Sequence, residues 1–269
     1  MGQALARMTR EDPSLRVAVD PETGQTLVRG MGELHLLICV ETLKEDHNVE
    51  ASIGAPRVAY REAITTKASV DYTHRKQNGG VGQMARVHLV FEPLSDGETG
   101  LRFENRVAGG TIPKAFVPSI QKALQHAMQT GGLAGYPVLG LKATLVDGAF
   151  HAKDSSGMAF EVASREAFKI GFEKARPVLL EPMMRVTVTT SGDCLGAVIG
   201  DLLGRRGKVL VSDMKGNAHE ITANVPLANM FNYVNTVRSL SQGRANFTMQ
   251  LDHYAPMPEA PQAKVIAAA

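Results

Sequence analysis

Residues 74–85 have the types and spacing best suited to chemistry. Three of these twelve residues are glycine, and residues 80–85 satisfy the spacing G-x-G-x-x-A of a dinucleotide-binding fingerprint. That fingerprint needs a helix after it, so that the pyrophosphate lies at the helix N-terminus. Residues 86–91 instead alternate apolar and polar side chains, which indicates a strand. We therefore interpret the segment as an exposed hairpin tip, made polar and basic by His74, Arg75 and Lys76.

No other combination of side chains predicts catalysis or a metal site. Cys39 and Cys194 are isolated, and the eight histidines do not form the H-x-x-x-H or H-E-x-x-H spacing of a zinc site. We find no spacing of a nucleophile with a base, or of two carboxylates, that argues for an enzyme. The sequence also lacks G-x-x-x-x-G-K-[ST], the phosphate loop that a GTPase requires. We therefore expect no metal and no bound nucleotide cofactor in this chain.

The composition is that of a folded protein with more than one core. A chain of 269 residues suggests two or three domains, and its residues are 44% hydrophobic and 21% charged. The net charge of +2 permits a nucleic-acid partner without requiring one. Isolated cysteines favour a reducing cytoplasm, and no apolar run approaches the ~20 residues that span a bilayer. We expect a cytoplasmic monomer that does not bind a membrane.

Two segments that flank the hairpin tip predict related arrangements of helices and strands. Residues 1–55 fit the order α-β-β-α-β, a ferredoxin-like βαββαβ unit without its first strand, and its last strand is expected at 49–53. Residues 181–252 fit the complete order β-α-β-β-α-β. Its second helix is expected to begin with Pro226 and to continue through Val234. Together these segments predict the α+β fold class.

Residues 56–180 predict a different unit that carries the tip. Its strands are expected near 58–66, 67–72, 86–93, 101–106 and 138–147, and its helices near 113–129 and 155–174. Asp154 or Ser155 is the expected N-cap of the second helix. In that helix Phe160, Phe168 and Phe172 recur at multiples of four, which indicates core packing. Residues 253–269 contain a proline break and a short helix near 263–269, and we expect them to return to this unit.

Short motifs fall into three groups along the chain. The first group is Glu11-Asp12-Pro13-Ser14 and Gly30-Met31-Gly32-Glu33-Leu34-His35. The second is Tyr60-Arg61-Glu62, Gly109-Gly110-Thr111-Ile112-Pro113 and Leu133-Ala134-Gly135-Tyr136-Pro137. The third is Leu179-Leu180-Glu181-Pro182, Arg205-Arg206-Gly207 and Val225-Pro226-Leu227. In this order they resemble the third, fourth and fifth domains of the bacterial elongation factor G family. The resemblance implies two ferredoxin-like units flanking a ribosomal-protein-type α/β domain with a left-handed βαβ crossover.

The resemblance also implies a role for two loops, at 77–84 and 148–153. They would lie together at the far end of the fourth domain and enter the decoding region beside the duplex of messenger RNA and transfer RNA. Exposed glycines beside cations suit contact with phosphates without base reading. The implied tip residues are His74, Arg75, Lys76, Asn78, Gly79, Gly80, Gly82, Gln83 and His151. Without the resemblance, His151 would be a loop histidine with no assigned role.

Arg205, Arg206 and Lys208 form the clearest basic cluster of the last unit. The resemblance implies that they contact ribosomal RNA. An equal alternative is a solvated helix end, where cations interact favourably with the helix dipole. The residues alone leave both interpretations open.

As a whole, the resemblance implies the ribosome-engaging part of a translational GTPase that promotes translocation of transfer RNA and messenger RNA during elongation. Its partners would be ribosomal RNA, ribosomal proteins and the tRNA–mRNA duplex, with ribosome recycling factor as a further partner if it also acts in recycling. GTP and magnesium would bind in an N-terminal domain that this sequence lacks. A ribosomal protection protein or a recycling-specialised paralogue remains an alternative. A free-standing RNA-binding module is less favoured, because the strand near 209–213 carries none of the aromatics on which RNA-binding sheets stack bases.

Overall fold

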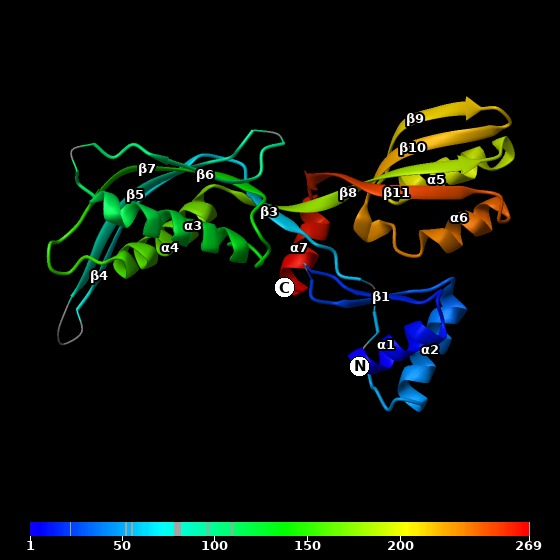
Figure 1. Cartoon of the computed structure of the whole chain (residues 1–269). Coiled ribbons are helices and arrows are strands. Elements are labelled where there is room, and N and C mark those ends of the chain that lie inside the picture. Colours follow the sequence, from blue (N-terminus) through cyan, green and yellow to red (C-terminus); the bar gives the residue numbers. More distant parts are fainter. Residues whose placement is uncertain are drawn as a thin grey trace.

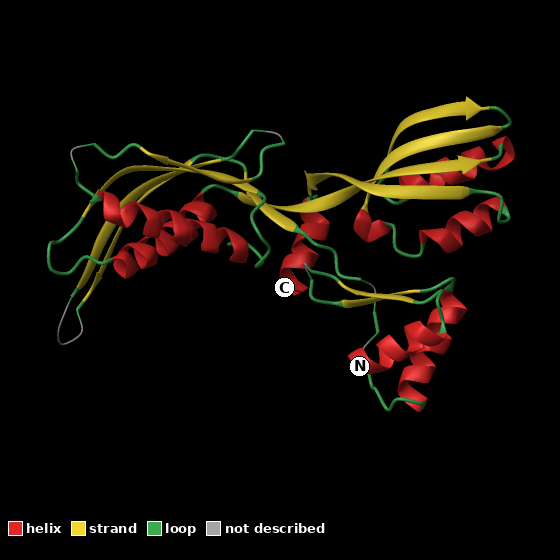
Figure 2. Cartoon of the chain, viewed as in Figure 1, coloured by secondary structure: helices red, strands yellow, loops and turns green. Residues whose placement is uncertain are grey.

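The chain forms three units, each with its own hydrophobic core (Figure 1). The computed structural model describes residues 1–21, 23–51, 53–54, 56–77, 82–95, 97–108 and 110–268. Figure 2 shows separate sheets, each covered by helices, which confirms the α+β fold class.

The N-terminal unit has a two-stranded antiparallel sheet and two helices. Its elements are α1 (Gly2–Glu11), β1 (Arg16–Val19), β2 (Thr26–Arg29) and α2 (Glu33–Glu45). Both helices bury apolar positions spaced by three or four residues, including Leu5 and Met8 of α1 and Cys39 and Leu43 of α2. These elements agree with the sequence prediction.

The middle unit is a four-stranded sheet with two helices on one face. Its elements are β4 (Ala68–Lys76), β5 (Gln83–Glu92), β6 (Gly100–Asn105), η1 (Lys114–Phe116), α3 (Val117–Thr130), β7 (Gly140–Ala149) and α4 (Gly157–Lys174). The strand order is β4-β5-β7-β6, and only the β6–β7 pair is parallel. The β6-α3-β7 connection is therefore the expected βαβ crossover, whose left hand stays a prediction.

Aromatic packing joins α4 to the sheet of the middle unit. The ring of Phe168 meets Phe91 of β5 edge to face at a centroid distance of 6.0 Å and stacks on Phe172 at 5.3 Å. A Cβ on Gly171 would lie 2.4 Å from the Phe91 ring, so only glycine lets the helix approach this closely. The predicted phenylalanine core, including Phe160, is confirmed.

The C-terminal unit has the complete βαββαβ order, of which the N-terminal unit has only a part. Its elements are β8 (Pro177–Thr190), η2 (Gly192–Cys194), α5 (Leu195–Gly204), β9 (Lys208–Lys215), β10 (Ala218–Pro226), η3 (Leu227–Asn229), α6 (Tyr233–Ser241) and β11 (Asn246–Pro256). The antiparallel order is β11-β8-β10-β9, so the last strand of the unit pairs with its first.

The helix expected from Pro226 through Val234 is wrong at its start. Pro226 ends β10 and precedes only the single turn η3. Asn232 then adopts a left-handed conformation with φ 61°, and α6 begins after it at Tyr233. Because a left-handed residue cannot continue a right-handed helix, the apolar spacing across this segment belongs to two short elements.

The strand expected at 49–53 is absent from the described residues of that segment, so this prediction is also wrong. The Val49 amide instead donates to the Leu43 carbonyl at 3.0 Å and closes the end of α2. A strand needs a neighbour for its backbone groups, and in the C-terminal unit the last strand finds it in the first. No strand precedes α1 in the described part of the chain, so residues 49–51 find no such neighbour there.

One long strand connects the middle and C-terminal units. The first residues of β8 pair with β3 (Arg61–Ile64), and its later residues pair with β10 and β11. The chain then returns to this junction: the Met257 amide donates to the Leu179 carbonyl at 2.9 Å, and the Tyr254 hydroxyl donates to the Ala59 carbonyl at 3.1 Å. Helix α7 (Glu259–Ala268) lies beside it (Figure 1) and begins before the predicted 263.

Candidate nucleic-acid interface

The hairpin of β4 and β5 holds the first tip loop. Its last paired residues are Lys76 and Gln83, and His74 Nε2 lies 3.2 Å from the side-chain oxygen of Gln83. The side chains of Arg75 and Lys76 are exposed. The predicted tip residues Asn78, Gly79 and Gly80 lie outside the described residues.

The second tip loop, which follows β7, is tied to this hairpin by backbone and side-chain contacts. The Ser155 hydroxyl donates to the Met84 carbonyl at 2.5 Å and accepts the backbone N–H of His151 at 2.8 Å. The Met84 amide in turn donates to the Asp154 carbonyl at 2.9 Å. The two loops are more than sixty residues apart in sequence, and these bonds bring them to one place.

The N-cap of α4 differs from the sequence prediction. Ser156, rather than Asp154 or Ser155, accepts the backbone N–H of Ala159, at 3.2 Å. Ser155 is thereby free to bridge the two loops, a role that sequence reasoning missed. The signal in the sequence was the adjacent pair Ser155-Ser156, since only one of two hydroxyls can cap a helix.

His151 is oriented by a carboxylate at the tip. Its Nδ1 lies 2.9 Å from Oδ2 of Asp154, and 55% of its side chain is exposed. A ring held through Nδ1 leaves Nε2 available to a partner from solution. Gly82 packs against the same carboxylate, because a Cβ there would lie 3.0 Å from the Asp154 carboxyl carbon. The structure therefore brings together His74, Gly82, Gln83 and His151 from two loops.

The side chains at the tip are suited to contact with an anion. Arg75, Lys76 and Lys153 are exposed cations, and His151 adds a ring nitrogen. Among the described residues, no three histidine, cysteine or carboxylate side chains gather as they would around a metal ion. Cations and histidine donors suit the phosphates of a nucleic-acid backbone.

In the C-terminal unit, Arg205 is held by contacts within the protein. Its guanidinium donates to Asp201 at 2.8 Å, to the Asn229 carbonyl at 2.6 Å and to the Thr236 hydroxyl at 2.9 Å. It also lies 4.9 Å from the centre of the Tyr233 ring. Only 19% of its side chain is exposed, so the alternative of a solvated helix end does not describe Arg205.

Arg206 is committed to the junction between the middle and C-terminal units. It adopts a left-handed backbone conformation and pairs through both terminal nitrogens with Glu181 of β8, whose side chain is 3% exposed. Lys208 is exposed and makes no ion pair within the described part of the chain, whereas Arg206, which is also exposed, is paired with Glu181. The structure thus separates Arg205, Arg206 and Lys208 by environment.

Sequence reasoning missed a polar contact made by Glu62 at the base of the middle unit. This side chain is fully buried, and its two oxygens accept four backbone N–H groups at 2.7–3.0 Å. The donors are Gly132, Leu133, Ala134 and Tyr136. Gly131 starts this turn with φ 64°, and a Cβ there would meet the Tyr136 carbonyl at 2.2 Å. Two motifs quoted separately from the sequence therefore form one structure.

The Glu62 structure stands next to the Glu181–Arg206 pair. The rings of Tyr60 and Tyr136 meet edge to face with centroids 5.4 Å apart. Burial raises the pKa of the Tyr60 hydroxyl above its ordinary value, and the nearby Tyr136 hydroxyl and Glu181 carboxylate raise it further. The base of the middle unit therefore gathers polar side chains whose hydrogen bonds and ion pairs connect it to the C-terminal unit.

Three family models match adjacent parts of the chain. Elongation factor G domain III matches residues 1–55, elongation factor G domain IV matches residues 56–176, and the elongation factor G C-terminus matches residues 178–265. A crystal structure of a protein from Thermus thermophilus is 38% identical in sequence, covers 99% of this chain and superposes with a TM-score of 0.85. The present chain spans 40% of that protein's chain.

These matches confirm the resemblance, and the chain belongs to the elongation factor G family of translation elongation factors. In the described residues, no helix has both the length and the apolar character that crossing a bilayer requires.

Proposed function

We propose that this chain is the ribosome-engaging part of an elongation factor that promotes the movement of transfer RNA and messenger RNA. The tip of the middle unit contacts their duplex. The observation that carries this proposal is that two distant loops form one tip. Ser155 and Asp154 hold the loops together, and His151 and Arg75 are exposed there.

The tip offers contacts to the backbone of RNA rather than to its bases. The major groove of an A-form duplex is too narrow for side chains to read, so proteins recognise the duplex by its shape, phosphates and 2′-hydroxyl groups. Arg75, Lys76 and His151 are donors of the matching kind. A contact made only in the state through which the RNAs move lowers the barrier to that movement.

A contacting tip is useful only if it is held firmly at its base. The continuous strand β8, the amides around Glu62 and the Glu181–Arg206 pair connect the middle unit to the C-terminal unit. These contacts support a role for the middle unit as an arm that transmits the position of the C-terminal unit to the tip. Lys208 of the C-terminal unit is the proposed contact with ribosomal RNA.

GTP hydrolysis belongs, in this proposal, to a part of the parent protein outside this chain. The sequence lacks the phosphate loop on which such chemistry depends. Isothermal titration of the 269-residue chain with GTP and magnesium is expected to give no heat of binding. A micromolar site would contradict this assignment.

The experiment that tests the proposal replaces His151 with alanine in the full-length factor and follows translocation by rapid mixing. His151→Ala is expected to slow translocation, because the tip loses a contact in the state through which the RNAs move. GTP hydrolysis on the ribosome and the melting temperature should stay nearly unchanged, because an exposed loop side chain buries little apolar surface. Translocation at the normal rate would refute the tip assignment.

Phe168→Ala is the matched contrast within the same unit. This ring is buried in the core, and truncation of a buried aromatic costs roughly 3–5 kcal/mol. Phe168→Ala is expected to unfold the middle unit, whereas His151→Ala should not. A His151→Ala protein that melts as early as Phe168→Ala would show that the histidine is structural.

A further inference from the structure

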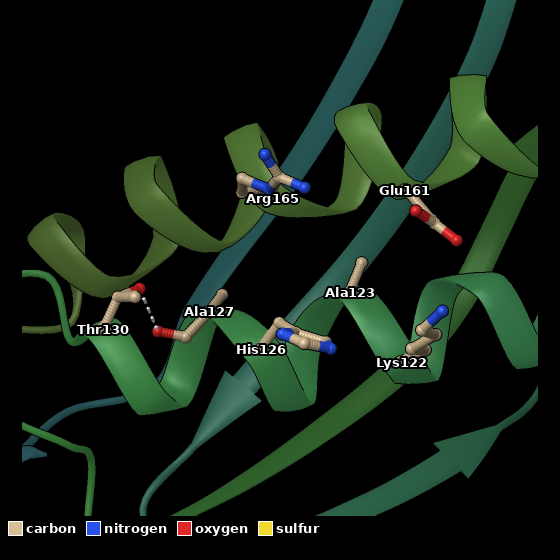
Figure 3. A pocket seen from close by; sticks show the side chains of 7 residues that line it. All are labelled: Lys122, Ala123, His126, Ala127, Thr130, Glu161 and Arg165. Carbon is tan, nitrogen blue, oxygen red and sulfur yellow. Dashed lines mark hydrogen bonds between the residues drawn. The ribbon is translucent and has the colours of Figure 1, made fainter.

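A second cationic site lies on the flank of the middle unit. A groove of about 390 Å³ runs between α3 and α4 (Figure 3). Lys122, His126 and Thr130 enter it from α3, and Glu161 and Arg165 enter it from α4. None of these side chains belongs to the tip.

The three basic side chains of this groove make no ion pair, in contrast to two of the arginines that the sequence analysis singled out. Within the described part of the chain, Lys122, His126 and Arg165 make no ion pair or side-chain hydrogen bond. Arg205 and Arg206, by contrast, are each held by several partners. Unpaired cations that converge on one groove from two helices are placed for an anionic ligand.

Helix α3 carries further polar side chains, without carboxylates, beside the groove. Gln121, Gln125 and Gln129 are exposed and spaced by four residues, so they form a row beside Lys122, His126 and Thr130 on the same side of the helix. No aspartate or glutamate occurs between Glu104 and Asp147. The surface of α3 therefore offers cations, amides and a hydroxyl, and no carboxylate.

The length of the groove favours an extended ligand over a single ion. Lys122 and Thr130 are separated by about 12 Å along the helix axis, at about 1.5 Å per residue. Glutamine amides both donate and accept, as 2′-hydroxyl groups do, whereas the carboxylates of an acidic peptide only accept. An RNA strand satisfies both the cations and the glutamine row.

We propose that the groove between α3 and α4 binds the sugar–phosphate backbone of RNA, as a second contact separate from the tip. Lys122 and Arg165 contact phosphates, and Gln125 and Gln129 contact the sugars beside them. Glu161 weakens this contact by repelling phosphate. The inference rests on the proposed function only in that both name RNA as the partner of the middle unit.

The test is the binding of a fluorescein-labelled RNA hairpin by the 269-residue chain, measured by anisotropy over a range of salt concentrations. Lys122→Gln with Arg165→Gln is expected to weaken binding about 10-fold and to lower the salt slope by about one to two, because two phosphate contacts are lost. Glu161→Gln is expected to strengthen binding, because a like charge is removed. Opposite effects from neighbouring residues of one groove distinguish binding at this site from nonspecific attraction of RNA to the charge of the whole protein.

Lys169→Gln with Lys174→Gln is the matched control, since both lysines are exposed on α4 outside the groove. This pair should change RNA affinity less than about two-fold, and melting curves of all variants should superimpose. The inference is overturned if the control pair weakens binding as much as the groove pair, if Glu161→Gln fails to strengthen it, or if the chain does not bind the hairpin. Binding of poly-L-glutamate through Lys122 and Arg165, without RNA binding, would identify an acidic protein as the occupant instead.

The outcomes separate this inference from the proposed function. Normal RNA binding by the groove variants together with slow translocation by His151→Ala would leave the tip assignment in place and remove the groove. Weakened RNA binding by the groove variants together with normal translocation by His151→Ala would do the reverse.

Discussion

The two ends of the middle unit hold similar side chains in opposite environments. At the base, the Glu62 carboxylate is fully buried among four backbone amides, and Arg206 pairs with a nearly buried Glu181. At the tip, His151 and Asp154 form a pair of which both members are more than one-third exposed. The comparison teaches that burial, rather than residue type, decides whether a charge stabilises the fold or stays available to a ligand.

The largest expected effect is at the base, on removal of the Glu62 carboxylate. Glu62→Ala leaves four backbone N–H groups without their acceptor, and each part-buried hydrogen bond contributes about 1 kcal/mol, so we expect a loss of about 4 kcal/mol. Hydrogen exchange of the Gly132, Leu133 and Ala134 amides measures this loss directly. Gln83→Ala at the tip is the control and should stay within about 0.5 kcal/mol of the parent. Slow amide exchange in Glu62→Ala would contradict the conclusion that the buried carboxylate stabilises the base.

A smaller loss is expected at the second contact of the base. Arg206→Ala leaves Glu181 buried without its counter-ion, which should cost about 2–4 kcal/mol, less than for a fully buried pair because Arg206 is itself partly exposed. The double variant Arg206→Met with Glu181→Leu should recover most of this stability in urea unfolding. If the double variant is as unstable as the single one, the loss of stability does not come from the unpaired charge of Glu181 alone.

The N-terminal unit extends the comparison to a region with an incomplete sheet. Its two strands have four residues each, and residues 49–51 form no third strand. Two-stranded sheets are marginally stable by themselves, so amide exchange should be fastest in residues 1–51. Uniform protection across all three units would show that another segment or chain completes this sheet.

The smallest expected effect on stability is at the tip cations. Arg75→Ala and Lys76→Ala should each change the free energy of unfolding by less than about 0.5 kcal/mol, because both side chains are exposed. Each should nevertheless weaken RNA binding and lower its salt slope by about one. Thermal melting and RNA anisotropy on the same samples check both parts. A clear loss of stability would show that these residues stabilise the fold, as those of the base do, rather than serve only to bind a ligand.

Most elements could be predicted from local patterns. Helix α2 (Glu33–Glu45) has the place in the chain that the order α-β-β-α-β predicts, because its apolar spacing and the flanking glycine are local signals. The hairpin tip was recognised because residues 86–91 alternate as a strand does, which excluded a nucleotide-binding loop. The errors fell where local spacing was misleading, at the left-handed Asn232 and at the paired serines that precede α4.

The sequence by itself determined the family, the α+β class and the order of most elements. Only the tertiary structure decided that residues 49–51 form no strand, that Arg205 and Arg206 are held by partners within the protein while Lys208 is exposed, and that Glu62 organises a turn. The physical reason is distance along the chain. Glu62 and the Gly132 amide are separated by 70 residues, and whether a charge is buried or a strand is paired depends on such remote neighbours.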